Sequence, residues 1–365
     1  MSTPDYRIEW IDELKGFILL IVCIEHINIS SSIIQTGIAI SLGFQMTSFF
    51  FLSGILYNAS RYPTYASYLI NKNRSLLYPY ILLSLLFIFL DPRFYNINFI
   101  QLDHTGIPNS INNSLEYLHL NLLNIFYFGN SSIITGPLWF VFSLYFINIF
   151  FSFLYYSFHK HRNIKILISC IIFLLLGWIC NIYRINLPFN LDTTSTSYFF
   201  FCCGYFCKDL YLSINNNKRY FIFLLCFSSA IIYMISININ GNIHLHSNTL
   251  GTNFLFYIIT TLSGISFITL TFTLINNIKH QFTNYIYGIL RLIANNGLII
   301  LAVHHWTYRC CRIFLHEYIN EYWFSYLSLL IVTITCTISI PVFRNKLYWM
   351  IGKNKISIKE SLSIK

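Results

Sequence analysis

The residues best suited to chemistry lie in one apolar stretch near the N-terminus, KGFILLIVCIEH, which covers residues 15–26. It begins with Lys15 and ends with Glu25 and His26, and the residues between them are mostly apolar. A neutral imidazole is a competent general base near pH 7, and a nearby carboxylate can orient it and stabilise its charged form. The stretch therefore indicates proton transfer inside an apolar segment, with Glu25 either supporting His26 or pairing elsewhere.

Helical geometry places the lysine and the histidine on one face. Lys15 and His26 are eleven positions apart, which is about 20° past three full turns, and Asp12 lies about 40° off the same line. At 1.5 Å per residue, His26 lies about 16 Å deeper than Lys15, near the middle of a hydrocarbon core about 30 Å thick. Ionisable residues at that depth usually mark functional sites. The stripe predicts a polar cavity that runs from the cytoplasm to His26.

The composition indicates that the elements carrying this stripe lie in a membrane. Hydrophobic residues make up 56% of the 365 residues and charged residues 10%, whereas soluble proteins carry about 25% charged residues. Ten segments approach the roughly 20 apolar residues that a spanning helix needs. They are 14–34, 40–58, 76–91, 137–158, 164–182, 195–213, 219–238, 252–276, 292–314 and 324–345. We therefore expect an all-α fold, a polytopic membrane helix bundle of about ten transmembrane helices.

The distribution of positive charge sets the predicted orientation. With the N-terminus in the cytoplasm, nineteen of the 23 Lys and Arg residues fall on cytoplasmic segments, in agreement with the positive-inside rule. Both termini are then cytoplasmic, and the net charge of +10 reflects membrane orientation rather than nucleic-acid binding. We expect residues 1–365 to form a single membrane domain. Its long outer loop, 92–136, is a natural place for a substrate site or lid.

Cysteines and late histidines call for separate predictions. The ten cysteines lie mostly in apolar runs without CxxC spacing, so we expect them to be small apolar packing residues and to form no metal site.

His304 and His305 lie in another apolar run, and we expect one to face the cavity and the other a neighbouring helix. Ser53 and Gly54 are best explained by close helix packing.

Six segments in chain order resemble the integral-membrane acyltransferase-3 family. In WIDELKGFILLIVCIEH, Lys15 and His26 match that family's basic residue, ten positions and catalytic histidine. The other segments are FQMTSFFFLSGILYN (44–58), NKNRSLLYPY (71–80), GPLWFVFSLYF (136–146), LPFNLDTTSTSYFFFCCGYF (187–206) and IANNGLIILAVHH (293–305). Lys15 and Lys72 stand where many members have arginine, and Ala294 and Asn295 stand where a glycine-rich start is common. The chain is most similar to the stand-alone polysaccharide O-acetyltransferase type.

The resemblance implies an enzyme of the inner membrane. Such an enzyme moves an acyl group, most often acetyl, from cytoplasmic acyl-CoA to a hydroxyl of an envelope glycan. The glycan would be O-antigen of lipopolysaccharide, capsule or another exopolysaccharide, reached directly or as a lipid-linked sugar. Expected partners are therefore acyl-CoA, the glycan, membrane lipid and, in an oligomer, further copies of the chain. No nucleic acid and no metal is expected.

The resemblance also implies roles for individual residues. His26 would be catalytic and Glu25 would support it, with acetyl-CoA as acyl donor. The cations that would bind the donor's phosphates are Lys15, Lys72 and Arg74. The residues that would contact the acceptor are Trp139, Asp192 and His304. Simpler explanations exist for several of these: ordinary positive-inside charge for Lys72 and Arg74, an interfacial anchor for Trp139, and a helix cap for Asp192.

Two mechanisms and two other function classes stay open at this point. His26 could act as a general base for the acceptor hydroxyl or carry the acyl group as an acyl-imidazole. A proton-coupled transporter or flippase would instead use Glu25 and His26 as a proton relay. It would show net solute flux and no acylated product. A purely structural membrane scaffold leaves the polar stripe unexplained.

Overall fold

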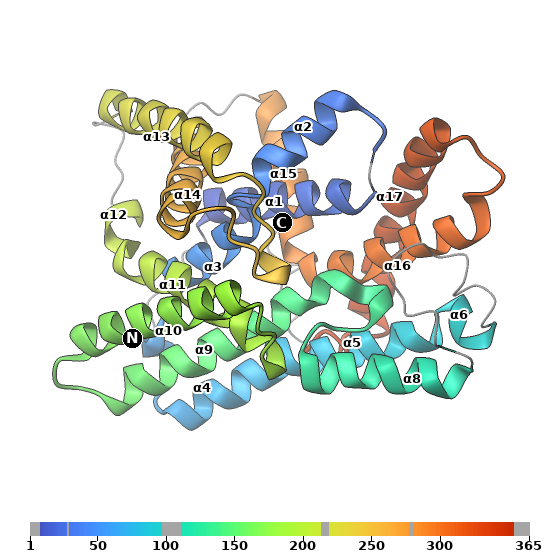
Figure 1. The fold of residues 1–365 in the computed structure, drawn as a ribbon, viewed down its shortest axis with the longest axis horizontal. Coiled ribbons are helices and arrows are strands. Elements are labelled where there is room, and N and C mark those ends of the chain that lie inside the picture. The colour runs from blue at the N-terminus through green and yellow to red at the C-terminus, as the bar shows by residue number, and fades with distance from the viewer. Residues whose placement is uncertain are drawn as a thin grey trace. The chain divides into compact units, whose positions relative to one another are not determined.

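The structure is a computed structural model that describes residues 8–27, 29–96, 111, 113–212, 219–276 and 281–353. These residues form helices and turns (Figure 1), and within the described ranges the only β pairing is an isolated bridge between His244 and Thr249. The chain divides into two compact units of noncontiguous segments. The first comprises Met1–Val22, Gly37–Tyr57 and Phe200–Gly297; the second comprises Cys23–Thr36, Asn58–Phe199 and Leu298–Lys365.

The stripe of the N-terminal segment lies on one unbroken helix, α1 (Glu9–Ile27). Its first turn is acidic, which suits the positive end of the helix dipole. Arg291 of α15 (Gln281–Asn295) bridges Glu9 and the buried Glu13 at 3.0 and 2.9 Å, so the start of α1 is held by an ion-pair network. Because α1 is one continuous helix, the prediction that Lys15 and His26 lie on the same face of a helix is confirmed.

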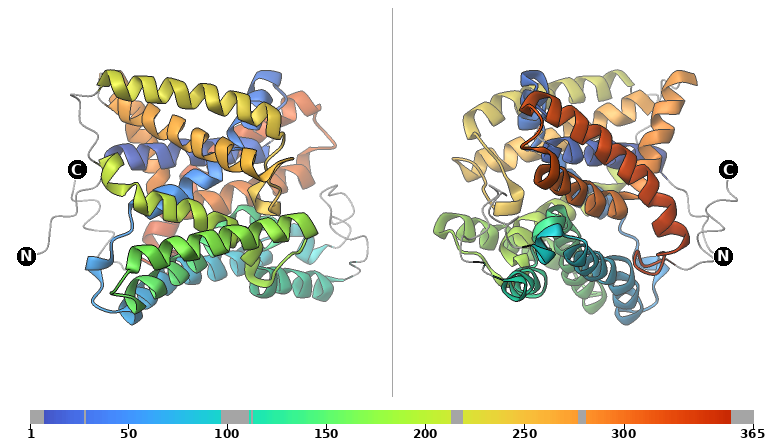
Figure 2. Two further views of the ribbon diagram at one scale, coloured as in Figure 1. Left: turned by 60° about the vertical axis from the view of Figure 1, so that its left-hand side comes forward. Right: turned by 90° about the vertical axis from the view of Figure 1, so that its right-hand side faces the viewer.

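The first unit is organised around a long helical hairpin. Helices α13 (Arg219–Asn240) and α14 (Phe254–Asn276) pack against each other along their lengths, as both views in Figure 2 show. The Tyr233 hydroxyl of α13 donates to the backbone carbonyl of Ile40 in α2 (Ser32–Ser41). The hairpin is thereby joined to the α2–α3 region.

Two glycines of the first unit allow two helix backbones to touch. Gly54 of α3 (Gln45–Ile55) lies against the carbonyl of Phe201, and Gly204 of α11 (Leu191–Phe206) lies against the carbonyl of Phe51. A Cβ atom at either glycine would overlap that carbonyl oxygen. The interpretation of the Ser53–Gly54 pair as a close-packing element is therefore confirmed at Gly54.

The second unit contains most of the remaining helices. Helices α4, α9 and α10 lie side by side in Figure 1. The elements are η1 (Ala59–Arg61), α4 (Tyr65–Lys72), the π-helical turn η2 (Asn73–Leu77), α5 (Tyr78–Phe89), α6 (Pro92–Tyr95), α8 (Ser114–Leu123), η3 (Asn124–Phe128), η4 (Ile133–Leu138), α9 (Trp139–Ser157), α10 (Arg162–Tyr183), η5 (Pro188–Asn190), the start of α11, α16 (Gly297–Leu315) and α17 (Glu321–Asn345).

The exposed surfaces of several helices are apolar, as expected for helices in lipid. α10 buries Cys170 and Gly177 but exposes a run of Ile and Leu residues between Ile164 and Ile182. Such a surface would be unusual on a soluble monomer. Within the described residues five helices are long and apolar enough to span a membrane, or seven if two bent pairs each count as one span. A multi-pass helical membrane bundle is supported.

The predicted count of ten spans is not confirmed, and neither is the cytoplasmic position of the termini. The difference in count has a physical cause in each segment. α1 carries several charges, α5 has only 12 residues and α11 has only 16 residues. None of the three is therefore both long enough and apolar enough to span a membrane by itself. The predicted span 292–314 is also interrupted at Asn296, where α15 ends and α16 begins. The prediction of one continuous helix there is wrong.

The predicted outer loop 92–136 is largely helical where the structure describes it; residues 97–110 and 112 lie outside the described part. Helices α8 and η3 cover residues 114–128 of this loop. Tyr117, Asn121 and Ile125, one turn apart from each other, are buried, whereas Leu115 and Phe126 are exposed. The polar hydrogen-bonding side of α8 therefore faces the protein.

Candidate active site

Three histidines of the second unit gather around the end of α1. The His26 ring lies 5.2 Å from the His305 ring and 5.6 Å from the His304 ring, measured between centroids. The His304 and His305 rings lie 6.2 Å apart. His304, which the resemblance assigns to the acceptor site, thus lies beside His26. The expectation that only one of the two late histidines faces this position is wrong, because both rings contact His26.

Hydrogen bonds assign a tautomer to each late histidine. Nδ1 of His304 lies 2.7 Å from the carbonyl oxygen of Ile300, one turn earlier in α16. Nδ1 of His305 lies 2.7 Å from the carbonyl oxygen of Ile134. A carbonyl oxygen only accepts, so in both rings Nδ1 carries the proton and, in the neutral ring, Nε2 carries the lone pair. Nε2 of His304 is buried and has no hydrogen-bond partner among the described residues.

The short segment Ser131–Gly136 holds His305 in place. The Ser131 hydroxyl donates to the carbonyls of Thr135 and Gly136, at 3.0 and 2.9 Å, and closes the segment into a tight turn. Gly136 lies beside the imidazole, where a Cβ atom would be 3.3 Å from Cε1 of His305. A side chain at Gly136, the first residue of the matched motif GPLWF, would therefore press on the His305 ring and shift it slightly.

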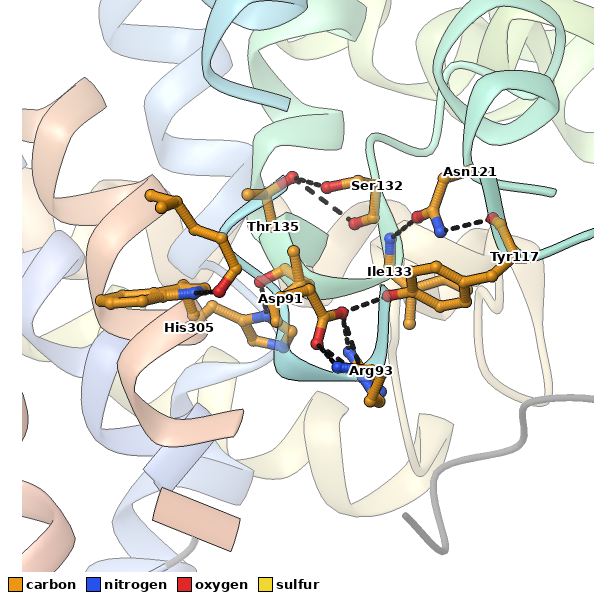
Figure 3. A network of polar contacts seen from close by, with 11 residues as sticks. Asp91, Arg93, Tyr117, Asn121, Ser132, Ile133, Thr135 and His305 are labelled. Carbon is orange, nitrogen blue, oxygen red and sulfur yellow. Dashed lines mark hydrogen bonds and ion pairs between the residues drawn. The ribbon is translucent and has the colours of Figure 1, made fainter. Parts of the chain in front are cut away.

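A buried polar network anchors the same segment to α8 and to the start of α6 (Figure 3). The N–H of Ile133 donates to Oδ1 of Asn121 at 2.9 Å, and the Asn121 amide donates to the carbonyl of Tyr117 at 2.9 Å. The Tyr117 hydroxyl donates to the carboxylate of Asp91. Arg93 forms an ion pair with Asp91 at 2.8 Å, and both side chains have zero exposure. A continuous set of contacts thus runs from the Asp91–Arg93 pair to the segment that holds His305.

The predicted acceptor residues are buried near two helix N-termini. Trp139 is the first residue of α9, and Asp192 lies in the first turn of α11. The Asn190 amide donates to the Ser143 hydroxyl at 2.8 Å and so links the start of α11 to the Trp139 helix. Asn190 and Phe189 both have positive φ, a conformation that costs non-glycine residues about 1–2 kcal/mol each. Strain of this kind is concentrated at functional sites.

Polar side chains continue along the start of α11. The residues from Asp192 to Ser197 are all buried, and Thr194 and Ser197 have hydroxyls without a partner among the described residues. Gly177 of α10 lies directly against Thr196, which allows α10 to cover this polar turn closely. Sequence reasoning singled out Asp192 but not the hydroxyl run that follows it.

The predicted donor-binding cations lie on two different units. Lys15 is on α1 in the first unit. Lys72 and Arg74 belong to the second unit, at the junction of α4 and the π-helical turn η2. Nζ of Lys72 lies 5.2 Å from the Tyr68 ring centroid, a cation–π contact, and Arg74 is exposed. Glu25 is half-buried on α1 beside His26.

Comparison with known proteins identifies the family. Residues 8–341 match a family model described as an acyltransferase domain, the acyltransferase-3 model. The chain belongs to the acyltransferase-3 family. Neither a curated protein nor a solved structure matches the chain.

Membership of the acyltransferase-3 family makes the protein an enzyme that transfers acyl groups other than amino-acyl groups. The transporter and scaffold hypotheses predict no acylated product, and membership gives them no support. Within the described residues no group of His, Cys, Asp and Glu side chains is placed to hold a metal ion. Imidazoles of this kind can act as bases, nucleophiles or hydrogen-bonding groups.

His305 is the functional candidate that sequence reasoning missed. Its signal was the His304–His305 pair, but adjacent helical residues point about 100° apart, so the sequence favoured one of them. The structure resolves this because α1 lies where both rings reach His26.

Replacing His305 by alanine should lower kcat by up to about 10²-fold, because small displacements of reacting groups can have effects of that size. His305→Asn should recover part of the rate, since its amide can still donate to the Ile134 carbonyl. The measurement is steady-state acyl transfer in purified membranes, with kcat separated from KM. His119→Ala, on an exposed position of α8, is the matched control. Wild-type kcat in His305→Ala would remove His305 from the site.

Proposed function

We propose that the protein is a membrane O-acyltransferase that moves an acyl group, most often acetyl, from acyl-CoA to a hydroxyl of an envelope glycan. The observation that carries the proposal is the His26–His304–His305 cluster, with a buried imidazole nitrogen of His304 unpartnered among the described residues. A buried, unpartnered nitrogen beside a candidate base suits a substrate hydroxyl as its missing partner. Family membership supplies the reaction type, and the donor and acceptor are our proposals.

In direct transfer, His26 is the general base. Its unprotonated nitrogen takes the proton of the acceptor hydroxyl while the hydroxyl oxygen bonds to the thioester carbonyl carbon. The carbon–sulfur bond then breaks, and the thiolate of coenzyme A leaves with the proton returned by His26. The products are the acyl ester and free coenzyme A. His304 and His305 lie against the His26 ring, and their Nε2 lone pairs can accept hydrogen bonds from other hydroxyls of the acceptor.

In the covalent variant, His26 is the nucleophile. Its nitrogen bonds to the thioester carbonyl carbon, the carbon–sulfur bond breaks, and coenzyme A leaves while the acyl group stays on the imidazole. The acceptor hydroxyl then attacks, and the carbon–nitrogen bond breaks. This second step needs another base for the hydroxyl proton, and the adjacent His304 and His305 can take that role. Acyl-protein that accumulates with acyl-CoA but without acceptor would distinguish this route from direct transfer.

The donor's phosphates and the acceptor sugar need different surroundings. Lys15, Lys72 and Arg74 fall on segments that the positive-inside rule assigns to the cytoplasm, where acyl-CoA is available. Asp192 and Trp139 fall near the predicted outer ends of their helices, where envelope sugars are available. A carboxylate accepts hydrogen bonds from sugar hydroxyls, and the buried hydroxyl run after Asp192 adds further donors and acceptors.

The proposed function is tested by mass spectrometry of envelope glycans. Cells with the intact gene should carry glycans heavier by whole acetyl groups than cells without it. Restoring the wild-type gene should restore the mass difference, and restoring a His26→Ala gene should not. Identical glycan masses in all strains would remove the envelope glycan as acceptor. A mass step other than acetyl would identify a different acyl group.

A further inference from the structure

A cavity of about 330 Å³ lies where the π-helical turn η2 meets the turn that follows α17. Its volume falls within the range of about 300–1,000 Å³ typical of small-molecule sites. The residues that line it are Ile70, Asn73, Arg74, Tyr78, Tyr348, Trp349, Gly352 and Lys353. We call it the η2 cavity.

The turn after α17 is closed by its own backbone hydrogen bonds, and it packs against η2 through Gly352. The N–H of Gly352 donates to the Trp349 carbonyl and the N–H of Lys353 donates to the Tyr348 carbonyl, at 3.2 and 3.0 Å. Gly352 has φ of +70°, a value that favours glycine, and its Cα lies against the Arg74 carbonyl, where a Cβ atom would overlap. Met350 and Ile351 are buried beneath the turn. The cavity wall is therefore built by packing and hydrogen bonds.

The cavity combines two cations with three aromatic rings. Arg74 and Lys353 both line the cavity, and they come from two different elements, η2 and the C-terminal turn. Tyr78, Tyr348 and Trp349 supply the rings, and Trp349 is 54% exposed, so its face is available to a ligand. The Tyr145 hydroxyl donates to Oδ1 of Asn73 at 2.7 Å, which leaves the NH₂ group of that amide as a donor.

This chemistry matches a purine nucleotide with phosphates. Aromatic side chains stack on nucleobases, and guanidinium and ammonium groups bind phosphate oxygens. Both walls come from segments that the charge distribution assigns to the cytoplasm, which is the side where a nucleotide-bearing donor is available. An anionic lipid headgroup would offer the phosphate but no base for the rings.

We propose that the η2 cavity binds the adenosine bisphosphate end of acyl-CoA, with Trp349 and Tyr348 against the adenine and Arg74 and Lys353 on the phosphates. The inference rests on the proposed function, because it names the place where that function's donor is held. It adds the C-terminal turn to the donor site, beyond the cations that the sequence motif indicated.

The test uses full-length protein in nanodiscs and adenosine 3′,5′-bisphosphate as the probe. Trp349→Ala and Lys353→Glu should each weaken probe binding about tenfold or more, as expected for loss of one base stack or one phosphate contact. Both should raise KM for acyl-CoA with less effect on kcat, and Trp349→Phe should retain most of the binding. Lys346→Glu is the matched control, because it makes the same charge change at an exposed position of the same turn outside the cavity.

Each contrary outcome has a separate meaning. If acyl-CoA is used in a His26-dependent manner and neither variant changes probe binding or KM, the η2 cavity is not the nucleotide site and the proposed function stands. If wild-type protein neither binds the probe nor uses acyl-CoA, the donor is wrong and the cavity assignment fails with it. If the variants lose binding of phosphatidylglycerol but keep the probe, the cavity holds lipid phosphate and the nucleotide assignment is overturned.

Discussion

His26→Ala is expected to reduce acyl transfer by at least 10²-fold and up to about 10⁴-fold, the range attributed to a positioned acid–base group. The physical reason is that the hydroxyl proton loses its acceptor, or the acyl group loses its carrier. His304 and His305 keep their Nε2 lone pairs, but the hydrogen bond from Nδ1 to a backbone carbonyl fixes each ring in its own position, so neither ring can move into the place that His26 occupies. The measurement is single-turnover transfer of labelled acyl groups in purified membranes.

The control for this experiment is a histidine outside the cluster. His159 is exposed after α9, and His159→Ala should leave transfer near the wild-type rate. Protein amount, membrane insertion and thermal stability are compared for all three proteins, so that a folding defect is separated from a chemical one. A folded His26→Ala protein that transfers acyl groups at the wild-type rate would contradict both the base and the relay mechanisms.

Asp91→Leu is expected to destabilise the protein by about 3–5 kcal/mol, the usual effect of breaking a buried ion pair from one side. Arg93 would keep its charge with zero exposure and lose the 2.8 Å contact to the carboxylate. The Tyr117 hydroxyl would lose its acceptor as well. Because the same network leads through Asn121 and Ile133 to the carbonyl that binds His305, kcat should also fall. Thermal unfolding and acyl transfer are measured on the same samples.

A variant that removes the whole polar group tests the explanation. The triple replacement Asp91→Leu, Arg93→Met and Tyr117→Phe leaves no buried charge and no orphaned hydroxyl, so it should recover most of the lost stability. Asp209→Leu, at an exposed position, should change stability by less than about 0.5 kcal/mol. A single Asp91→Leu protein as stable as the wild type would show that the ion pair contributes nothing to stability.

Much of the candidate site could be predicted from residue types and spacing. An uninterrupted apolar stretch with charges only at its ends favours one helix, and α1 is one helix from Glu9 to Ile27. The resemblance predicted that His304 contacts the acceptor, and the structure places its ring 5.6 Å from that of His26. The polar residues that interrupt the predicted span 292–314 are visible in the sequence, but composition alone does not show that one helix ends at Asn295 and another begins at Gly297.

Long-range pairings could not be predicted, because nothing local in a sequence specifies them. Asp91 and Tyr117 are separated by 26 positions, and His305 and Ile134 by 171. Their polar groups are buried, and a buried donor without an acceptor costs free energy, so packing brings each of them to a partner from a distant segment. The η2 cavity could not be predicted for the same reason, since the local sequence of the C-terminal turn shows only an ordinary basic composition.

By itself the sequence determined the membrane class, the helical stripe from Lys15 to His26 and, through six ordered segments, the enzyme family. These follow from composition, from the fixed geometry of an α-helix and from motif order, which need no knowledge of distant contacts. Only the tertiary structure decided that both late histidines contact His26 and that a buried network supports His305. It also decided that the turn after α17 packs against the backbone of Arg74. Those facts depend on which helix faces pack together, and side-chain burial across noncontiguous segments sets that choice.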